Sequence, residues 1–240
     1  MNKTTVLVVA LLVAGTSQAK ADGYDWSGVY GGIYGGGAWS NGIEYDEFAL
    51  FANNPANPYR ASVSGNNLSI GGLLGMNKQF SNGFVVGSEF DVGIGSSASG
   101  IFGDSFGTNP GTSFKINGGF SGSGRVRLGY SVGKLMPFVT GGVAYTNFSM
   151  DELNCANPGC VIGHRTGTGQ AFGATIGAGV NYALTDNVIL GAEYRYSNYG
   201  PTSVTTVLDN ATTSALQGKL GNYQFNLQTS EVRATLAFKF

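Results

Sequence analysis

Charged side chains are scarce in this 240-residue chain, at 11% of residues, against roughly 25% in an ordinary soluble domain. Long apolar runs are missing too. No stretch beyond the first 21 residues approaches the about 18 apolar residues of a membrane-spanning helix, which excludes helical spans there. Low charge combined with 40 glycines could indicate disorder. However, 15 phenylalanines and 12 tyrosines, many at alternate positions, argue against a disordered chain.

The first 21 residues have the pattern of a secretory signal peptide. Lys3 makes the start basic, residues 6–15 form a short apolar core, and Ala19-Lys20-Ala21 fits an A-x-A cleavage site. The apolar core is too short for an anchor, which needs about 20 residues. We expect cleavage after Ala21, with cleavage after Ala19 as the alternative, which leaves 22–240 as the mature domain.

Basic residues are few in the expected mature chain. Two of the 13 basic residues, Lys3 and Lys20, lie in the signal, so the 14 acidic residues are in excess. This composition offers no basic surface for nucleic acid. An exported chain of this kind is soluble in the periplasm, released, or a barrel in the outer membrane.

A period of two favours the barrel. From Phe114 to Tyr130, large apolar residues such as Ile116 and Phe120 fall at even positions, and charged residues such as Lys115 and Arg125 fall at odd ones. Such alternation over seventeen residues predicts a long strand rather than a helix. Similar alternation marks 84–92, 172–182, 188–197 and 232–240. Segments 27–39, 69–80 and 137–148, where glycine blurs the phase, bring the expected number of strands to eight.

The connections alternate strictly between short and long. Tight turns are expected at 81–83, 132–134 and 185–187, and long loops near 40–67, 96–112, 150–168 and 198–223. Outer-membrane barrels combine short periplasmic turns with long external loops in this way. The prediction is therefore an all-β, eight-stranded antiparallel up-and-down transmembrane β-barrel with four long external loops and three short periplasmic turns.

A soluble β-sandwich is the alternative, because its strands also alternate between a buried and a wet face. Glycine is abundant on both faces here, which suits a narrow barrel whose lumen holds only small side chains. Tyrosines and tryptophans near strand ends are expected to form interfacial girdles. These residues are Tyr24, Trp26, Trp39, Tyr130, Tyr182 and Tyr196.

Several motifs resemble the OmpA-like outer-membrane barrels of alphaproteobacteria. They are the segments 25–30 (DWSGVY), 124–130 (GRVRLGY), 137–145 (PFVTGGVAY), 177–183 (GAGVNYA) and 191–196 (GAEYRY), with a terminal aromatic at Phe240. The resemblance covers the mature chain and implies the barrel fold. The family includes major surface antigens, proteins described as hemin-binding and porin-like members. Phe240 resembles the terminal signal that the barrel assembly machinery reads, which implies that machinery as a partner.

Charged residues on the inward faces are expected to meet in one layer of the lumen. Counted from the periplasmic ends at roughly 3.3 Å per residue, they lie at similar heights. The layer comprises Glu89, Asp91, Arg125, Arg127, Glu193, Arg195 and Arg233. We favour a structural plug, because a charge on the lipid face costs roughly 2–4 kcal/mol and inward charges must pair. A gate or lining for ion passage is the alternative. Lys78 has the outward phase, near a periplasmic end where it can reach the headgroups.

Two features of the expected third external loop could carry chemistry. Cys155 and Cys160 lie close together, and in an oxidising compartment they are expected to form a disulfide. His164 is the single histidine, and the resemblance makes it a candidate hemin ligand, although an exposed histidine without a role is the commoner case. No other cofactor and no metal is expected. Tyr199 and Tyr223, in the expected last external loop, are further candidate hemin ligands.

No enzyme is expected, because one histidine leaves little from which to build a catalytic group at the outer rim. Three functions remain: a structural and surface-display barrel, which we favour, a surface protein that binds hemin or another partner through its loops, and a narrow porin. The expected surroundings are outer-membrane lipid and lipopolysaccharide. A barrel closes its own edges, so a monomer is expected rather than an oligomer.

Overall fold

The computed structural model describes residues 23–46, 59–95, 98–101, 113–154, 163–209 and 220–240. Within these ranges the chain forms β1 Gly28–Asp46, β2 Tyr59–Gln79, β3 Phe84–Ile94, β4 Ala98–Ile101, β5 Ser113–Tyr130, β6 Leu135–Asn154, β7 Gly163–Ala183, β8 Val188–Asp209 and β9 Leu220–Lys239. In the described part of the chain, no helix is long and apolar enough to cross a membrane.

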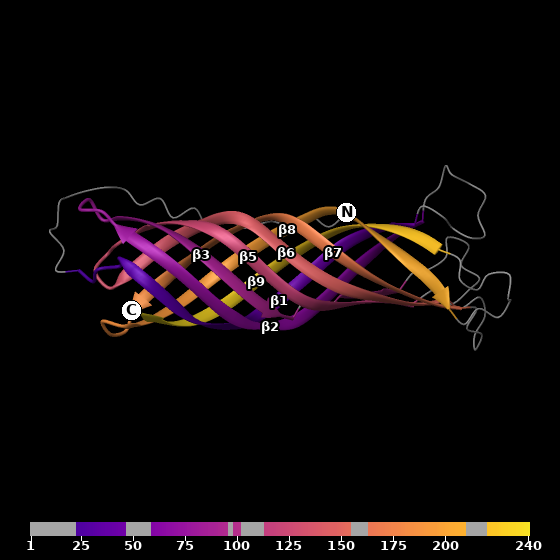
Figure 1. The fold of residues 1–240 in the computed structure, drawn as a ribbon, viewed down its shortest axis with the longest axis horizontal. Coiled ribbons are helices and arrows are strands. Elements are labelled where there is room, and N and C mark those ends of the chain that lie inside the picture. The colour runs from indigo at the N-terminus through magenta and orange to yellow at the C-terminus, as the bar shows by residue number, and fades with distance from the viewer. Residues whose placement is uncertain (1–22, 47–58, 96–97, 102–112, 155–162, 210–219) are drawn as a thin grey trace, which may run out of the picture.

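The sheet closes on itself. Neighbouring strands are antiparallel, and the first strand also pairs with the last, from Tyr30↔Lys239 to Asp46↔Tyr223 (Figure 1). β4 pairs with β2 and β5, the two neighbours of β3, so β3 and β4 occupy one position in the barrel. The fold is therefore the predicted closed eight-stranded up-and-down barrel.

The tight turns and the C-terminus lie at one end of the barrel, and the opposite ends of the strands, such as those of β6 and β7, lie at the other (Figure 1). The turns fall where they were predicted. In one, the Val188 amide donates to the Thr185 hydroxyl (3.0 Å), and in another the Leu135 amide donates to the Val132 carbonyl (3.0 Å). The strands run further toward the long connections than expected. Much of 150–168 and 198–223 is strand, because β6 ends at Asn154 and β8 at Asp209.

The outer face of the barrel is apolar. Exposed aliphatic or aromatic side chains point outward at all eight strand positions, among them Ile33, Leu74, Phe90, Leu128, Val143, Ile176, Leu190 and Leu236. Lys78 is exposed near the turn end, in the predicted outward phase. A belt of this kind faces the lipid in an outer-membrane barrel.

Aromatic rings border the apolar belt. Ring contacts occur near the turn end between Phe84 and Tyr130 (5.4 Å) and between Phe238 and Phe240 (5.6 Å), and further along the barrel Tyr145 contacts Phe120 (6.4 Å) and Phe172 (4.9 Å). On β7 the segment from Phe172 to Tyr182 is eleven residues long. A tilted strand needs about 9–11 residues to cross the membrane. The rest of β7, 163–171, therefore extends beyond it.

The expected girdle is only partly formed. Trp39, Tyr130 and Tyr182 are exposed on the outer face, but Trp26 lies inside the barrel with 1% of its surface exposed. Trp26 precedes β1, so the alternation of that strand does not set its direction. Tyr24 packs against Trp26 and is not part of an outer girdle (ring centroids 4.7 Å).

The phase of β5 changes at a bulge. The register between β5 and β6 shifts between Gly118 and Ser121, and the Phe120 amide donates to the Asn147 side chain (2.6 Å). An extra residue at a bulge reverses which face later residues occupy. Ile116 is therefore buried and Lys115 exposed, the opposite of the prediction from seventeen-residue alternation.

Candidate functional site

The lumen is filled in three layers. The first, near the turns, is an apolar cluster comprising Trp26, Tyr30, Tyr34, Leu73, Val85, Met136, Phe138, Ala183, Ile189 and Ala237. A second apolar cluster lies toward the long connections and comprises Ile116, Ala144, Phe148, Met150, Ala171, Tyr199, Val204 and Leu227. Between them lies a layer of charged residues, which is the candidate functional site.

Strand register places opposite charges beside one another. Glu89 on β3 is the register partner of Arg125 on β5. Across β8 and β9, Glu193 faces Arg233 and Arg195 faces Glu231. These side chains all point inward because they share one phase of the period-two alternation. Two charged half-layers, from β3–β5 and from β8–β9, therefore meet across the lumen.

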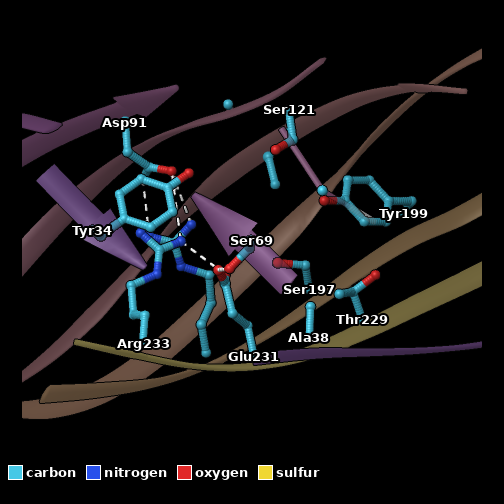
Figure 2. A pocket seen from close by; sticks show the side chains of 14 residues that line it. Tyr34, Ala38, Ser69, Asp91, Ser121, Ser197, Tyr199, Thr229, Glu231 and Arg233 are labelled. Atoms are coloured by element: carbon cyan, nitrogen blue, oxygen red, sulfur yellow. Dashed lines mark hydrogen bonds and ion pairs between the residues drawn. The ribbon is translucent and has the colours of Figure 1, made fainter. Parts of the chain in front are cut away.

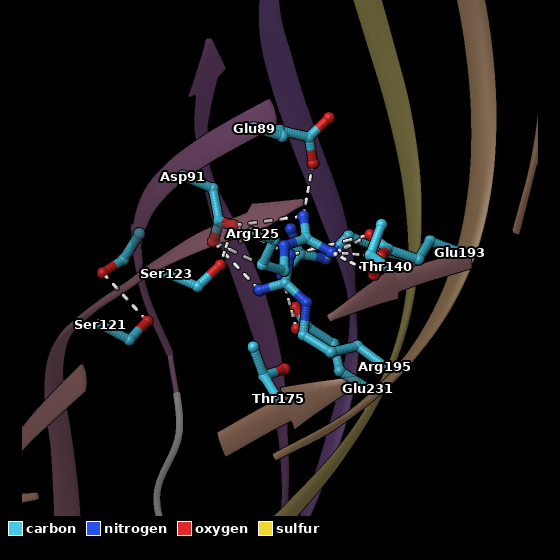
Figure 3. Close-up of polar contacts among 12 residues, drawn as sticks. Glu89, Asp91, Ser121, Ser123, Arg125, Thr140, Thr175, Glu193, Arg195 and Glu231 are labelled. Carbon is cyan, nitrogen blue, oxygen red and sulfur yellow. Dashed lines mark hydrogen bonds and ion pairs between the residues drawn. The ribbon is translucent and has the colours of Figure 1, made fainter. Parts of the chain in front are cut away.

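Arg125 is the centre of this ionic layer (Figure 3). Its guanidinium forms close ion pairs with Glu89 on the neighbouring strand and with Glu193 across the lumen. It also lies 3.3 Å from Asp91 and donates to the Thr140 hydroxyl at 3.1 Å. The Arg125 side chain is completely buried. One guanidinium therefore joins both half-layers.

A second bridge links the half-layers through Asp91. The two terminal nitrogens of Arg195 lie 3.1 and 2.9 Å from the two Asp91 oxygens, a bidentate arrangement. Arg233 pairs with Glu231 at 2.8 Å and lies 3.7 Å from Asp91. These contacts extend the ion-pair network from β3 to β9.

The sequence-based prediction of the ionic layer missed one residue, Glu231. All seven predicted residues lie in the layer and are at most 6% exposed, and Glu231 joins them at 9%. Glu231 lies two residues before Arg233 on the same face of β9, a signal that was present in the sequence. With four arginines and four acids the layer is formally neutral, rather than three acids against four bases. A neutral set reduces the cost of burying so many charges.

Two tyrosines extend the ionic layer toward the turns. The Tyr30 hydroxyl donates to Glu89 (2.8 Å), and the Tyr34 ring lies 4.0 Å from the Arg233 guanidinium. Glycines on β2 make room for both rings. A Cβ at Gly75 would lie 2.3 Å from the Tyr30 ring, and one at Gly71 would lie 2.5 Å from the Tyr34 ring. The inward glycines are therefore required by packing.

A small polar cavity of about 40 Å³ lies between the ionic layer and the second apolar cluster (Figure 2). Its wall includes Asp91, Glu231 and Arg233 from the layer, together with Ser197 and Tyr199. A space of this size holds only a few water molecules.

The profile of the outer membrane protein beta-barrel domain family matches residues 7–240, almost the whole chain. This protein belongs to that family. The protein is thus an outer-membrane β-barrel, as its fold and apolar belt indicate.

Named relatives agree with this assignment. The chain is 30% identical over 228 residues to the 31 kDa outer-membrane immunogenic protein of Brucella melitensis, covering 92% of this chain and 87% of the relative. It is 26% identical over 217 residues to the 25 kDa outer-membrane immunogenic protein of Brucella abortus, covering 90% and 80%. Both relatives are thus named as outer-membrane immunogenic proteins.

Solved structures share the fold. The outer membrane protein OprG from Pseudomonas aeruginosa superposes with a TM-score of 0.52 at 15% identity, covering 91% of this chain and 98% of OprG. The outer membrane protease OmpT from Escherichia coli gives 0.52 at 9% identity, covering 92% and 99%. At such identities the likeness shows the barrel architecture alone.

The other predicted sites have different outcomes. Cys155, Cys160 and the expected signal peptide lie outside the described residues. The His164 backbone belongs to β7, opposite Leu153 and Asp209. Phe240 is 76% exposed, and its amide donates to the Val29 carbonyl (2.9 Å). Its role as an assembly signal stays a prediction.

Proposed function

We propose that this outer-membrane barrel is a structural and surface-display protein whose lumen does not conduct ions. The observation that carries the proposal is the filled lumen: an ionic layer lies between two apolar clusters. A barrel of about eight strands has an interior just wide enough for its own side chains. The same filling disfavours the narrow-porin alternative.

The extended strands support surface display. β7 begins at Gly163, nine residues before Phe172, where the aromatic border lies. The second apolar cluster fills the lumen toward this end, with Met150 fully buried and Val204 only 1% exposed. A packed extension of this kind gives the loops a rigid base. We also propose that the protein acts without catalysis, and the support for this is that its relatives are named as outer-membrane immunogenic proteins.

The proposed partners follow from the same surfaces. The apolar belt contacts outer-membrane lipid and lipopolysaccharide, and the exposed Phe240 is available to the barrel assembly machinery. Closed edges favour a monomer. Hemin binding at His164 stays a separate prediction, and loss of a hemin absorption band in His164→Ala would support it.

Ion conductance of the refolded protein in a planar bilayer tests the proposed function. Folded protein, identified by faster gel migration before heating, is expected to give no stable current steps. Uniform steps would contradict the proposal and favour a porin. An altered step size in the Arg125→Ser, Arg127→Ser double variant would then assign the path to the ionic layer.

A further inference from the structure

Five residues before the first strand lie at the turn end of the lumen. We call residues 23–27 the latch. Its Trp26 belongs to the apolar cluster near the turns, together with Val85 of β3, Met136 of β6 and Ile189 of β8. Trp26 is 1% exposed, and Val85 and Met136 are fully buried. The indole thus fills a pocket whose walls come from strands around the barrel.

Hydrogen bonds attach the latch to β2. The Trp26 amide donates to the Gln79 side chain (2.8 Å), and the Gln79 amide donates to the Ser27 hydroxyl (3.1 Å). Within the latch, the Ser27 amide donates to the Asp25 carboxylate (2.9 Å), which holds the pKa of that carboxyl below its usual value. Two reciprocal hydrogen bonds therefore join the latch to the end of β2.

Other contacts attach the latch to the end of the chain. The Lys239 ammonium on β9 donates to the Asp25 carbonyl and lies 4.5 Å from the centre of the Tyr24 ring. The Tyr24 hydroxyl donates to the Asp186 carbonyl in the turn between β7 and β8 (3.0 Å). The latch thus touches strands on both sides of the seam between β1 and β9.

Gly28 lets the chain turn from the latch into β1. Its φ of +128° is a conformation that residues with a side chain rarely adopt. The Trp26 pocket needs β3, β6, β8 and β9 together, so it is complete only when the barrel has closed. Insertion of Trp26 must therefore follow or accompany closure.

We propose that residues 23–27 form an intramolecular latch that seals the periplasmic end of the lumen and braces the seam between the first and last strands. The occupant of the pocket is this chain's own Trp26. The proposal concerns one end of the barrel and does not depend on whether the lumen conducts.

Tryptophan fluorescence can test the latch, because the chain has only two tryptophans. In a Trp39→Phe variant, folded in lipid, Trp26 is the single reporter. We expect aqueous acrylamide to quench it several-fold less than in urea, and brominated lipid to leave it unquenched. In Trp26→Phe, brominated lipid should quench Trp39, which is 42% exposed on the outer face.

Removal of the latch contacts completes the test. Gln79→Ala with Lys239→Ala, added to Trp39→Phe, is expected to raise acrylamide quenching of Trp26 several-fold while the barrel stays folded on gels. The matched control is Asn82→Ala with Lys134→Ala. These two residues lie in the β2–β3 and β5–β6 turns at the same end of the barrel. Strong acrylamide quenching before any latch change would overturn the proposal. So would equal quenching in the latch and control variants.

Discussion

Arg125→Ala is expected to destabilise the barrel by about 3–5 kcal/mol, because removing one partner of a buried ion pair leaves the other charge uncompensated. Two carboxylates, Glu89 and Glu193, lose their closest cation in this variant, and Thr140 loses a donor. The midpoint and slope of urea unfolding in lipid vesicles, followed by the gel shift of the folded form, measure the change.

Two comparisons isolate the cause. Lys134→Ala removes a cation from a turn and should change the unfolding free energy by less than about 0.5 kcal/mol. Adding Glu193→Gln to Arg125→Ala should recover part of the loss, because three arginines then face three acids and Glu89 keeps its ion pair with Arg127. If Arg125→Ala unfolded at the same urea concentration as Lys134→Ala, the central position of Arg125 in the layer would be refuted.

Gly75→Ala is expected to have the second large effect, a loss of about 2–3 kcal/mol from overpacking. The new Cβ would lie 2.3 Å from Tyr30 Cζ and 2.4 Å from its hydroxyl oxygen. Tyr30 cannot move away freely, since it is 4% exposed and its hydroxyl donates to Glu89. Urea unfolding under the same conditions measures the loss.

A second glycine provides the control. A Cβ at Gly141 would meet no atom within 4 Å, so Gly141→Ala should be neutral or slightly stabilising. Replacing the Tyr30 ring with a smaller side chain in Tyr30→Leu should remove most of the additional cost of Gly75→Ala, because that cost comes from the contact between the new Cβ and the ring. Equal losses at Gly75 and Gly141 would show that the glycine is not needed for packing.

The strand pattern made the barrel and most of the ionic layer predictable. Because side chains alternate with a period of two, Glu89, Arg125 and Glu193 could be assigned to the lumen without coordinates. Counting residues from the tight turns then placed these three side chains at a similar height along the barrel axis, since each tight turn fixes where its two strands begin. Which arginine pairs with which acid across the lumen depends on barrel closure, and no local pattern contains that information.

The failures of prediction have local causes. The bulge at Gly118–Ser121 reverses the phase of β5, and glycines on both faces conceal it in the sequence. Trp26 lies outside any strand, so strand alternation could not show whether its side chain points into the lumen or lies at the membrane interface. Its direction depends on the positive φ of Gly28 and on a pocket assembled from distant strands.

The most direct test of a lumen sealed from both ends is the reactivity of a cysteine placed between the seals. Ser197 lines the polar cavity, is 4% exposed and donates to the Thr175 hydroxyl (2.9 Å). Ser197→Cys, in a Cys155→Ser, Cys160→Ser background, is expected to resist a small water-soluble methanethiosulfonate in the folded barrel and to react fully in urea. Val132→Cys in an exposed turn should react in both states. Rapid labelling of Ser197→Cys in the folded barrel would show that the reagent passes one of the seals from bulk solvent and would contradict a closed lumen.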